Sequence, residues 1–209
     1  DRRQGIRKID RLVVSHSDID HSGGTVAVMA GIEVARVLAG EPDMLSTGNT
    51  VACRRGQAWR WDDVAFRVLH PPAATQRSGN DASCVILVEA GDARLLLTGD
   101  IGSGVEHALA GLGVVDAVLV PHHGSDTSSS IAFVRSVSAD LALVSAGHRN
   151  RWGLPRPSVV RRWQDSGATV LVTARDGAIG FRLCDRAGIV RLSRHRQQSR
   201  RLWHEPPVR

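Results

Sequence analysis

The sequence has no tyrosine and few aromatic residues of any kind, which make up 4% of its 209 residues. It lacks an apolar run close to the ~20 residues that a membrane-spanning helix needs. Its opening, Asp1-Arg-Arg-Gln, does not resemble a secretory signal peptide. Disordered and collagen-like classes are also excluded, because 42% of the residues are hydrophobic and 23% are charged. We therefore expect a soluble globular chain of a length that suits one domain.

Cysteine is scarce. The three cysteines, Cys53, Cys84 and Cys184, are far apart and form no CxxC pair. This pattern predicts neither a disulfide framework nor a structural zinc ribbon. Cys84 opens an apolar run, Cys-Val-Ile-Leu-Val, where we expect it to be a buried small hydrophobic residue. The cysteines leave the cellular compartment undecided.

Acidic residues are rare in two parts of the chain. From Arg182 to the end there are eight arginines and two acids, which accounts for the whole formal charge of +6. A second stretch without acids also holds five arginines. The guanidinium group suits phosphate, so these clusters are either a solvated surface or a means of attracting a polyanion. The second cluster consists of Arg149, Arg151, Arg156, Arg161 and Arg162.

Short β-branched runs alternate with helical stretches, and Glu89–Arg94 is typical of a hairpin turn. This order predicts an α/β layered fold whose sheet is not purely parallel. Trp59 and Trp61 alternate in a further strand, where packing is the simpler interpretation and stacking on bases the alternative. The expected strands are 12–15, 34–38, 64–69, 84–89, 94–98, 117–120, 141–145, 169–173 and 178–183, and the expected helices are 24–30, 104–112, 131–136 and 157–166.

One segment concentrates residues that bind metals. His16, Asp18, Asp20 and His21 follow a strand and precede Gly23-Gly24. Carboxylates gathered at short range repel one another, and a divalent cation resolves that conflict. Imidazole and carboxylate are suitable ligands for such an ion. The segment therefore predicts a metal site, the alternative being a solvated acidic turn with two incidental histidines.

Two further strands end in potential ligands. Leu95–Gly99 leads into Asp100, and Val118–Pro121 leads into the pair His122-His123. Either motif alone could be an ordinary turn or a surface pair. However, strand ends in α/β folds converge at one rim of a sheet, where active sites form. The three motifs together predict a binuclear metal centre.

These motifs carry a resemblance. HSDIDH with Gly-Gly, then LLLTGD, then PHHGS resembles the metallo-β-lactamase fold superfamily, in its variant with Asp at the second histidine of HxHxDH. Together with NDASCVIL, SAGHRNRWGLPRP and TARDGAIGF, the chain is similar to the C-terminal hydrolase domain of ComEC-type DNA-uptake channels, over about residues 9–181. The resemblance implies an αββα sandwich over residues 1–184, apparently lacking its first strands, and an Arg-rich tail at 185–209.

The resemblance also implies a ligand set for two divalent ions, manganese or zinc. One ion would be held by His16, Asp18 and Asp100, and the second by Asp20, His21, Asp100 and His123, with Asp100 bridging. His122 would assist beside the metals or at the transition state, and Asn80 and Ser83 match the family's NDxS segment. The candidate catalytic residues are Asp20, His122 and Asn80, and the candidate substrate-binding residues are Ser125, Arg149, Asn150, Arg151, Trp152 and Arg156.

The implied activity is hydrolysis of phosphodiester bonds in single-stranded DNA during DNA uptake. The implied partners are that DNA and the membrane-channel portion of the same parent polypeptide. The implied location is a soluble domain on the extracytoplasmic face of a bacterial inner membrane. Carboxylate-rich ligands accept manganese as well as zinc, so the native metal stays open.

Two departures from the family leave alternatives open. Only Asp1–Asp10 stand where relatives carry a strand pair with an aspartate motif, and Leu154 and Arg156 replace histidines of Tyr-Gly-His-Pro-His-Pro. One alternative is a metallohydrolase of the same fold acting on a small ester, amide or thioester. The other is a catalytically degenerate domain that only binds DNA. An incomplete sheet would also make the isolated chain marginally stable or prone to associate.

Overall fold

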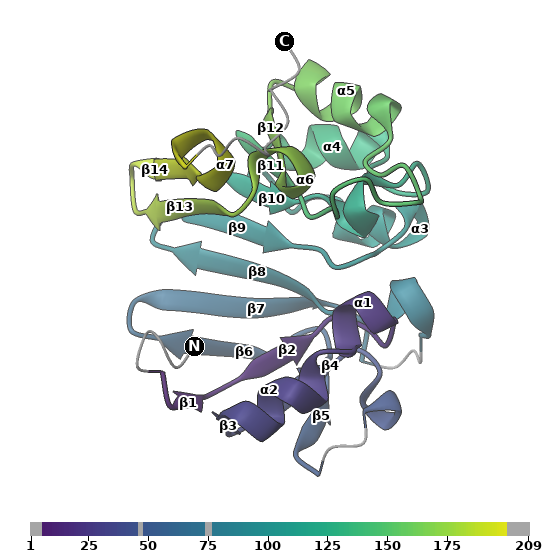
Figure 1. The fold of residues 1–209 in the computed structure, drawn as a ribbon, viewed down its shortest axis with the longest axis vertical. Coiled ribbons are helices and arrows are strands. Elements are labelled where there is room, and N and C mark those ends of the chain that lie inside the picture. The colour runs from purple at the N-terminus through teal and green to yellow at the C-terminus, as the bar shows by residue number, and fades with distance from the viewer. Residues whose placement is uncertain (1–5, 46–47, 74–76, 200–209) are drawn as a thin grey trace.

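The computed structural model describes residues 6–45, 48–73 and 77–199. A seven-stranded sheet has the order β12-β11-β10-β9-β8-β7-β6, and a three-stranded sheet has the order β2-β4-β5. Two two-stranded pairs, β1-β3 and β13-β14, complete the strands (Figure 1). The strands are β1 (Lys8–Ile9), β2 (Leu12–Val14), β3 (Glu33–Val34), β4 (Val37–Ala39), β5 (Thr50–Ala52), β6 (Ala58–Trp61), β7 (Val64–His70), β8 (Val85–Ala90), β9 (Ala93–Leu97), β10 (Ala117–Leu119), β11 (Leu141–Val144), β12 (Thr169–Val172), β13 (Ile179–Cys184) and β14 (Gly188–Arg194).

Helices lie between these strands and are mostly short. Pro157 opens α5, where its missing N–H costs no helical hydrogen bond, as expected for a first-turn proline. None of the helices within the described ranges has the length and apolar content required to cross a membrane. The helices are α1 (Ile19–Ser22), α2 (Thr25–Gly31), α3 (Ser103–Glu106), α4 (Ile131–Val137), α5 (Pro157–Asp165), α6 (Thr173–Asp176) and α7 (His195–Gln198).

The seven-stranded sheet is half parallel and half antiparallel. Strands β9, β10, β11 and β12 run parallel, whereas β6 to β9 pair antiparallel. The turn between β8 and β9 falls at Gly91, whose positive φ of 61° suits glycine. The predicted hairpin at Glu89–Arg94 and the mixed sheet are both confirmed.

Alternating side chains give this sheet two apolar faces, and each face is covered. On one face, Leu87, Leu96 and Val118 pack with Phe133 of α4 and Trp163 of α5. On the other face, Ile86 packs with residues of the three-stranded sheet, and the β13-β14 hairpin covers the end formed by β10 to β12. Helix α2 packs through Met29 on the outer side of the three-stranded sheet. The layers are therefore helix, sheet, sheet and helix, and the predicted αββα sandwich is confirmed.

Three expected elements differ in the structure. The strand expected at 34–38 is two strands, because β3 pairs with β1 whereas β4 pairs with β2, and the chain changes partner between them. The helix expected at 104–112 is only the single turn α3 followed by a 3-10 turn at His107–Leu109. Strand β14 lies in the expected tail and pairs antiparallel with β13. The Arg-Arg-Leu-Trp ending at 200–203 lies outside the described residues.

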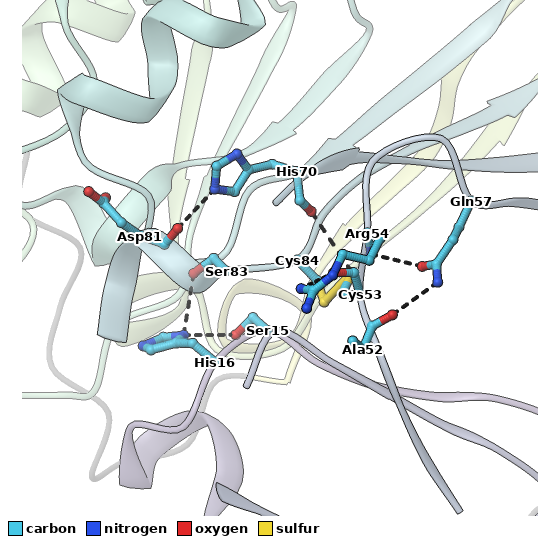
Figure 2. Close-up of a disulfide and its surroundings, with 10 residues drawn as sticks. All are labelled: Ser15, His16, Ala52, Cys53, Arg54, Gln57, His70, Asp81, Ser83 and Cys84. Carbon is cyan, nitrogen blue, oxygen red and sulfur yellow. Dashed lines mark hydrogen bonds between the residues drawn. A yellow bond between two sulfur atoms is a disulfide. The ribbon is translucent and has the colours of Figure 1, made fainter. Parts of the chain in front are cut away.

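The cysteine spacing predicts no disulfide framework, but the structure contains one disulfide. Cys53, which follows β5, and Cys84, which precedes β8, form a disulfide with their Cα atoms 5.8 Å apart (Figure 2). Packing of the two sheets brings together positions separated by 31 residues, which spacing in the sequence cannot reveal. The burial expected for Cys84 is confirmed, since it is 3% exposed. Cys184 is a free thiol.

Candidate metal centre

Three segments deliver polar side chains to one end of the sandwich. The chain leaves β2 at Ser15, passes His16 and Asp18, and enters helix α1, which carries Asp20 and His21. Asp18 precedes the first turn of α1 without capping it through its side chain, so its carboxylate stays available. Asp100 follows β9, and the Pro121–Gly124 turn after β10 carries His122 and His123. The predicted convergence of the three motifs is what the fold produces.

The ligand atoms of these residues lie close together. Asp100 presents one carboxylate oxygen 3.3 Å from His21 Nε2 and the other 3.2 Å from His123 Nε2. Asp20 Oδ2 lies 3.3 Å from His123 Nε2 and 3.9 Å from His21 Nε2. Asp18 Oδ2 lies 3.5 Å from His16 Nε2. Asp100 therefore lies between two imidazoles, with one imidazole at each of its carboxylate oxygens.

Two compact ligand groups can be distinguished within the described residues. One consists of His16, His21 and Asp100, and the other of Asp20, His21 and His123, with all ligand atoms of a group within 4.8 Å of one another. His21 belongs to both groups, whereas the family resemblance gave that sharing to Asp100. The assignment of individual ligands to two ions therefore stays a prediction.

His16 provides the test of whether a cation fits. Its residue is 1% exposed, and Nε2 is buried without a hydrogen-bond partner among the described residues. A buried polar atom without a partner is costly. Burial, reinforced by the nearby His21, lowers the pKa of His16, which favours the neutral imidazole that metals bind. Nε2 faces Asp18 Oδ2 at 3.5 Å, so imidazole and carboxylate ligand atoms adjoin each other and the donor set fits a divalent ion.

The Asp100 and His123 pair is strongly polarised. Burial by itself raises the pKa of Asp100, but hydrogen bonds from His123 and His21 outweigh it and hold that pKa far below its usual range. The hydrogen bond to Asp100 raises the pKa of His123 to about 9, against the lowering effect of burial. Without a cation, a proton on His123 therefore balances the Asp100 charge.

The turn that carries both histidines has an unusual backbone. His122 and His123 have φ angles of 49° and 53°, in the left-handed region that side chains usually avoid. His123 Nδ1 donates to the carbonyl oxygen of Ser145 at 2.8 Å, which leaves Nε2 directed at the acidic side chains. This backbone conformation sets the direction of both imidazoles, although six further described non-glycine residues also have a positive φ.

His122 lies beside the cluster in a separate polar chain. Its Nε2 faces the Asn80 amide at 3.4 Å, and its Nδ1 faces the Thr127 hydroxyl at 3.1 Å. Ser125, which is 8% exposed, contacts Thr127 at 3.0 Å. The structure thus brings the catalytic candidates His122 and Asn80 together and joins Ser125 to them through Thr127. Their catalytic and substrate-binding roles stay predictions.

The arginine loop (residues 147–156) lies against the histidine turn (Pro121–Gly124). The backbone N–H of Arg156 donates to Gly124 at 2.9 Å, and a Cβ at Gly124 would lie 2.5 Å from Pro155, so glycine is needed at this contact. The Asn150 amide closes the loop on itself through Gly147 and Leu154. The substrate-binding candidates Arg149, Arg151, Trp152 and Arg156 are exposed there.

A cavity of about 540 Å³ adjoins the cluster. Asp20, His21, Asp100 and His123 line one end, and side chains of β6 and β7 line another part. Trp59 stacks on Phe66 with ring centroids 5.1 Å apart, and the guanidinium of Arg11 lies 3.9 Å from the Trp59 ring. Packing, the simpler interpretation of Trp59, agrees with these contacts.

Sequence reasoning missed several supporting residues. Ser15 Oγ contacts two of the imidazoles, and Glu41 accepts hydrogen bonds from the backbone of Ser17 and Gly79, both at 3.0 Å. Burial alone would raise the pKa of Glu41, but these hydrogen bonds and one from the Ser17 hydroxyl lower it. A hydroxyl directly before a candidate ligand histidine was a usable signal for Ser15. Nothing local in the sequence marks Glu41, since its partners lie 24 and 38 residues away.

Comparison with known proteins gives consistent results. The profile of the Metallo-beta-lactamase superfamily matches residues 1–148. The chain is 39% identical over 183 residues to Competence protein ComA of Neisseria gonorrhoeae, covering 86% of this chain and 26% of that protein. It is 34% identical over 178 residues to Recombination protein 2 of Haemophilus influenzae, covering 85% of this chain and 22% of that protein. The chain thus spans about a quarter of the length of these relatives.

More distant comparisons agree on the fold. ComE operon protein 3 of Bacillus subtilis is 29% identical over 201 residues, which is 88% of this chain and 26% of that protein. Among solved structures, the diiron β-hydroxylase CmlA of Streptomyces venezuelae aligns with a TM-score of 0.53 at 15% identity, over 78% of this chain and 43% of that chain. At that identity the structural likeness speaks for the fold alone.

Proposed function

The chain belongs to the metallo-β-lactamase superfamily, and from that membership we propose that it is a metal-dependent phosphodiesterase that cleaves single-stranded DNA during DNA uptake. The superfamily consists generally of metal-dependent hydrolases. Similarity to proteins named for competence and recombination supports a role in DNA uptake. Nuclease activity, the single-stranded substrate and the use of two manganese or zinc ions are parts of the proposal.

The observation that carries the proposal is the convergence of three carboxylates and three imidazoles at one end of the sandwich. The Nε2–oxygen distances from Asp100 to His21 and His123 are 3.3 and 3.2 Å, and the buried His16 adds an Nε2 without a partner among the described residues. Divalent ions held by such a set supply a nucleophilic water of lowered pKa and positive charge against phosphate oxygens. His16, Asp18, Asp20, His21, Asp100 and His123 would hold them.

Two neighbouring side chains would act on the substrate directly. Thr127 at Nδ1 fixes the ring of His122, so that Nε2 and the Asn80 amide share one space. An imidazole and an amide in that space can hold a phosphate oxygen, and the imidazole can also move a proton at Nε2. The side chain of Asp20 is 57% exposed, whereas that of Asp100 is 7% exposed, so solvent and substrate reach Asp20 more readily than Asp100.

The arginine loop gives the proposal its preference for a nucleic acid. Arg149, Arg151 and Arg156 are exposed on a segment that packs against the His122–Gly124 turn. The Arg151 guanidinium lies 4.4 Å from the centre of the exposed Trp152 ring, so charge and an aromatic face occur together. Single-stranded nucleic acids are bound through this combination of basic side chains and stacking surfaces.

The parent polypeptide would supply the membrane channel, because the relatives are about four times longer than the part that this chain matches. The Cys53–Cys84 disulfide supports an oxidising compartment and hence the extracytoplasmic face. These points are consistent with degradation of the strand that is not taken up.

A second candidate is a small-molecule hydrolase of the same fold. The observation in its favour is the cavity beside the cluster, which has about the size of a small-ligand site. The exposed arginines next to the histidine turn favour the nucleic acid instead, because a small neutral ester has no use for them.

The deciding experiment measures cleavage of an end-labelled single strand with Mn²⁺ or Zn²⁺. Wild-type protein should cleave it, Asp20→Ala should not, and Asp165→Ala, which removes an exposed carboxylate of α5, should behave like wild type. A chromogenic small ester and elemental analysis of metal per chain run in parallel. Ester cleavage without DNA cleavage would establish the second candidate, and a chain that retains no metal but binds DNA would be the degenerate domain.

A further inference from the structure

We propose that Ser15 is a positioning residue whose single hydroxyl orients two imidazoles, those of His16 and His21, for metal binding. This inference rests on the proposed function in one respect: it takes both histidines as ligands. It adds a residue outside the ligand set. It concerns which nitrogen of each imidazole carries the proton, and not the reaction itself.

The geometry is direct. Ser15 Oγ lies 3.1 Å from His16 Nδ1 and 2.9 Å from His21 Nδ1. The two rings are neighbours, with centroids 4.3 Å apart. Figure 2 shows the Ser15 hydroxyl meeting the ring of His16 where β2 ends. One oxygen atom therefore contacts the inner nitrogen of both rings.

Ring chemistry gives this contact its consequence. An imidazole that binds a metal through Nε2 carries its proton on Nδ1, and that proton needs an acceptor. A hydroxyl oxygen has two lone pairs, so it can accept from two N–H donors at once. Even without metal, Nε2 of His16 makes no hydrogen bond in the described part of the chain and lies 3.5 Å from Asp18 Oδ2. Nδ1 lies closer to its partner, 3.1 Å from Ser15 Oγ, which favours the proton on Nδ1. Ser15 thus selects the tautomer in which Nε2 is free to bind a cation.

The surrounding backbone fixes where this hydroxyl lies. The carbonyl oxygen of Ser15 accepts from the N–H of Cys84 at 2.9 Å, which attaches the end of β2 to the start of β8. Gly99, at a φ of 58°, packs against Ser15, and a Cβ there would lie 3.1 Å from the Ser15 Cβ and 2.7 Å from the Ser83 Cβ. The backbone at Gly99, directly before Asp100, therefore packs closely against Ser15.

Ser83 and Ser145 also contact candidate ligands of the metal centre, but each contacts only one imidazole. Ser83 Oγ accepts from the N–H of Asp100 at 2.9 Å and lies 3.4 Å from His16 Nδ1, so it supports the ring more weakly than Ser15 does. For His123 the acceptor is the backbone carbonyl of Ser145. Ser15 is the one described side chain that contacts Nδ1 of two ligand histidines.

The first test reads the ring protons by nitrogen-15 NMR, with histidines labelled. In metal-free wild-type protein at pH 8, His16 should carry its proton on Nδ1. After zinc is added, His16 and His21 should both show Nδ1 protons that exchange slowly with solvent. In Ser15→Ala the His16 tautomer should become mixed and both Nδ1 protons should exchange faster.

The second test measures binding of Mn²⁺ and of Zn²⁺ by calorimetry. Loss of an outer hydrogen-bond partner weakens metal binding about 10- to 100-fold, and we expect Ser15→Ala to do so. Ser15→Thr keeps the hydroxyl and should restore binding to within about threefold of wild type. The matched control is Ser22→Ala, since the Ser22 hydroxyl, at the end of helix α1, bonds to the Ser17 carbonyl rather than to an imidazole.

The outcomes separate this inference from the proposed function. If wild-type protein binds no metal, the hydrolase proposal fails, and the His16 tautomer in the metal-free protein still decides the role of Ser15. If wild type binds metal and Ser15→Ala binds it equally well with unchanged ring protons, the inference is wrong and the hydrolase proposal stands. The wild-type spectrum needs no variant, so an unstable Ser15→Ala protein does not block the test: a His16 proton found on Nε2 overturns the inference.

Discussion

The Nε2 atoms of His21 and His123 lie 3.1 Å apart, although 102 residues separate the two histidines in the sequence. Two imidazolium groups would repel at this distance. Asp100 and Asp20 lie within 4 Å of these nitrogens and can balance protons there. The same carboxylates would balance cations instead, so protons and metal ions compete for one set of atoms.

The first prediction concerns the stability of metal-free protein against pH. The pKa of His123 is raised to about 9 in the folded protein from an unfolded value of about 6.5. A raised pKa stabilises the fold fully below pH ~6.5 and loses that contribution as pH rises through ~9. We expect the unfolding free energy to fall by about 2 kcal/mol between these limits, after allowance for partial exposure.

Urea unfolding at a series of pH values checks this expectation. His123→Asn removes the titrating ring and should flatten the profile between pH 6.5 and 9, whereas His107→Asn, on the far 3-10 turn, should leave it unchanged. A wild-type profile that is flat over this range would contradict the raised pKa.

A second prediction follows for metal binding. The metal must displace the proton from His123, so apparent affinity should rise with pH up to about 9. Near pH 7 each chain should release about one proton from this residue on binding. Calorimetry in buffers of different ionisation enthalpy measures the proton count directly. Equal heats in all buffers would mean that His123 is already neutral or does not bind metal.

Much of the fold could be predicted because its signals are local. The strand at Val64–His70 and the helix at Pro157–Asp165 appear near the expected positions, since β-branched runs and an apolar helix face with an N-terminal proline are visible within ten residues. The convergence of Asp100 with the HSDIDH loop was also predictable, because strand ends meet at one rim of a sheet.

The features that the sequence did not predict depend on partners that are far away in the sequence. Cys53 and Cys84 pair only because two sheets stack, and Gly188–Arg194 is a strand only because β13 offers an edge. Glu41 reaches Ser17 and Gly79 across the fold. The same limit applies within the site, where the sharing of His21 between two ligand groups depends on ring orientation and not on spacing.

A third prediction concerns the bridging position. Asp100→Asn keeps the shape but removes the charge that lies between His21 and His123. Because the family resemblance assigns Asp100 to both ions, and its two oxygens contact His21 and His123, we expect metal content after dialysis to fall from about two per chain to well under one. Elemental analysis gives the number, with Asp165→Asn as the control of equal charge change. A variant that keeps both ions would show that Asp100 does not bridge.

A fourth prediction concerns the arginine loop. Each arginine that neutralises a phosphate contributes about 0.7 to the slope of log affinity against log salt for single strands. Replacing Arg149, Arg151 and Arg156 with alanine should make that slope shallower by about two and leave metal content unchanged. The control Arg60→Ala removes an exposed cation of β6 that pairs with Asp63 at 3.5 Å. An unchanged slope would mean that residues other than these three arginines contact the DNA phosphates.

The last prediction concerns the disulfide. Joining positions 31 residues apart lowers the entropy of the unfolded chain and should stabilise the protein by about 3 kcal/mol. The double variant Cys53→Ser/Cys84→Ser should therefore melt at lower temperature, and reductant should destabilise wild type but not the double variant. Cys184→Ser is the control, because that thiol is free.

The effect of the disulfide should extend to the metal site, since Cys84 donates its N–H to the carbonyl oxygen of Ser15, whose hydroxyl contacts His16 and His21. Weaker metal binding in the double variant would support this coupling, whereas equal binding would show that the disulfide affects only the stability of the fold.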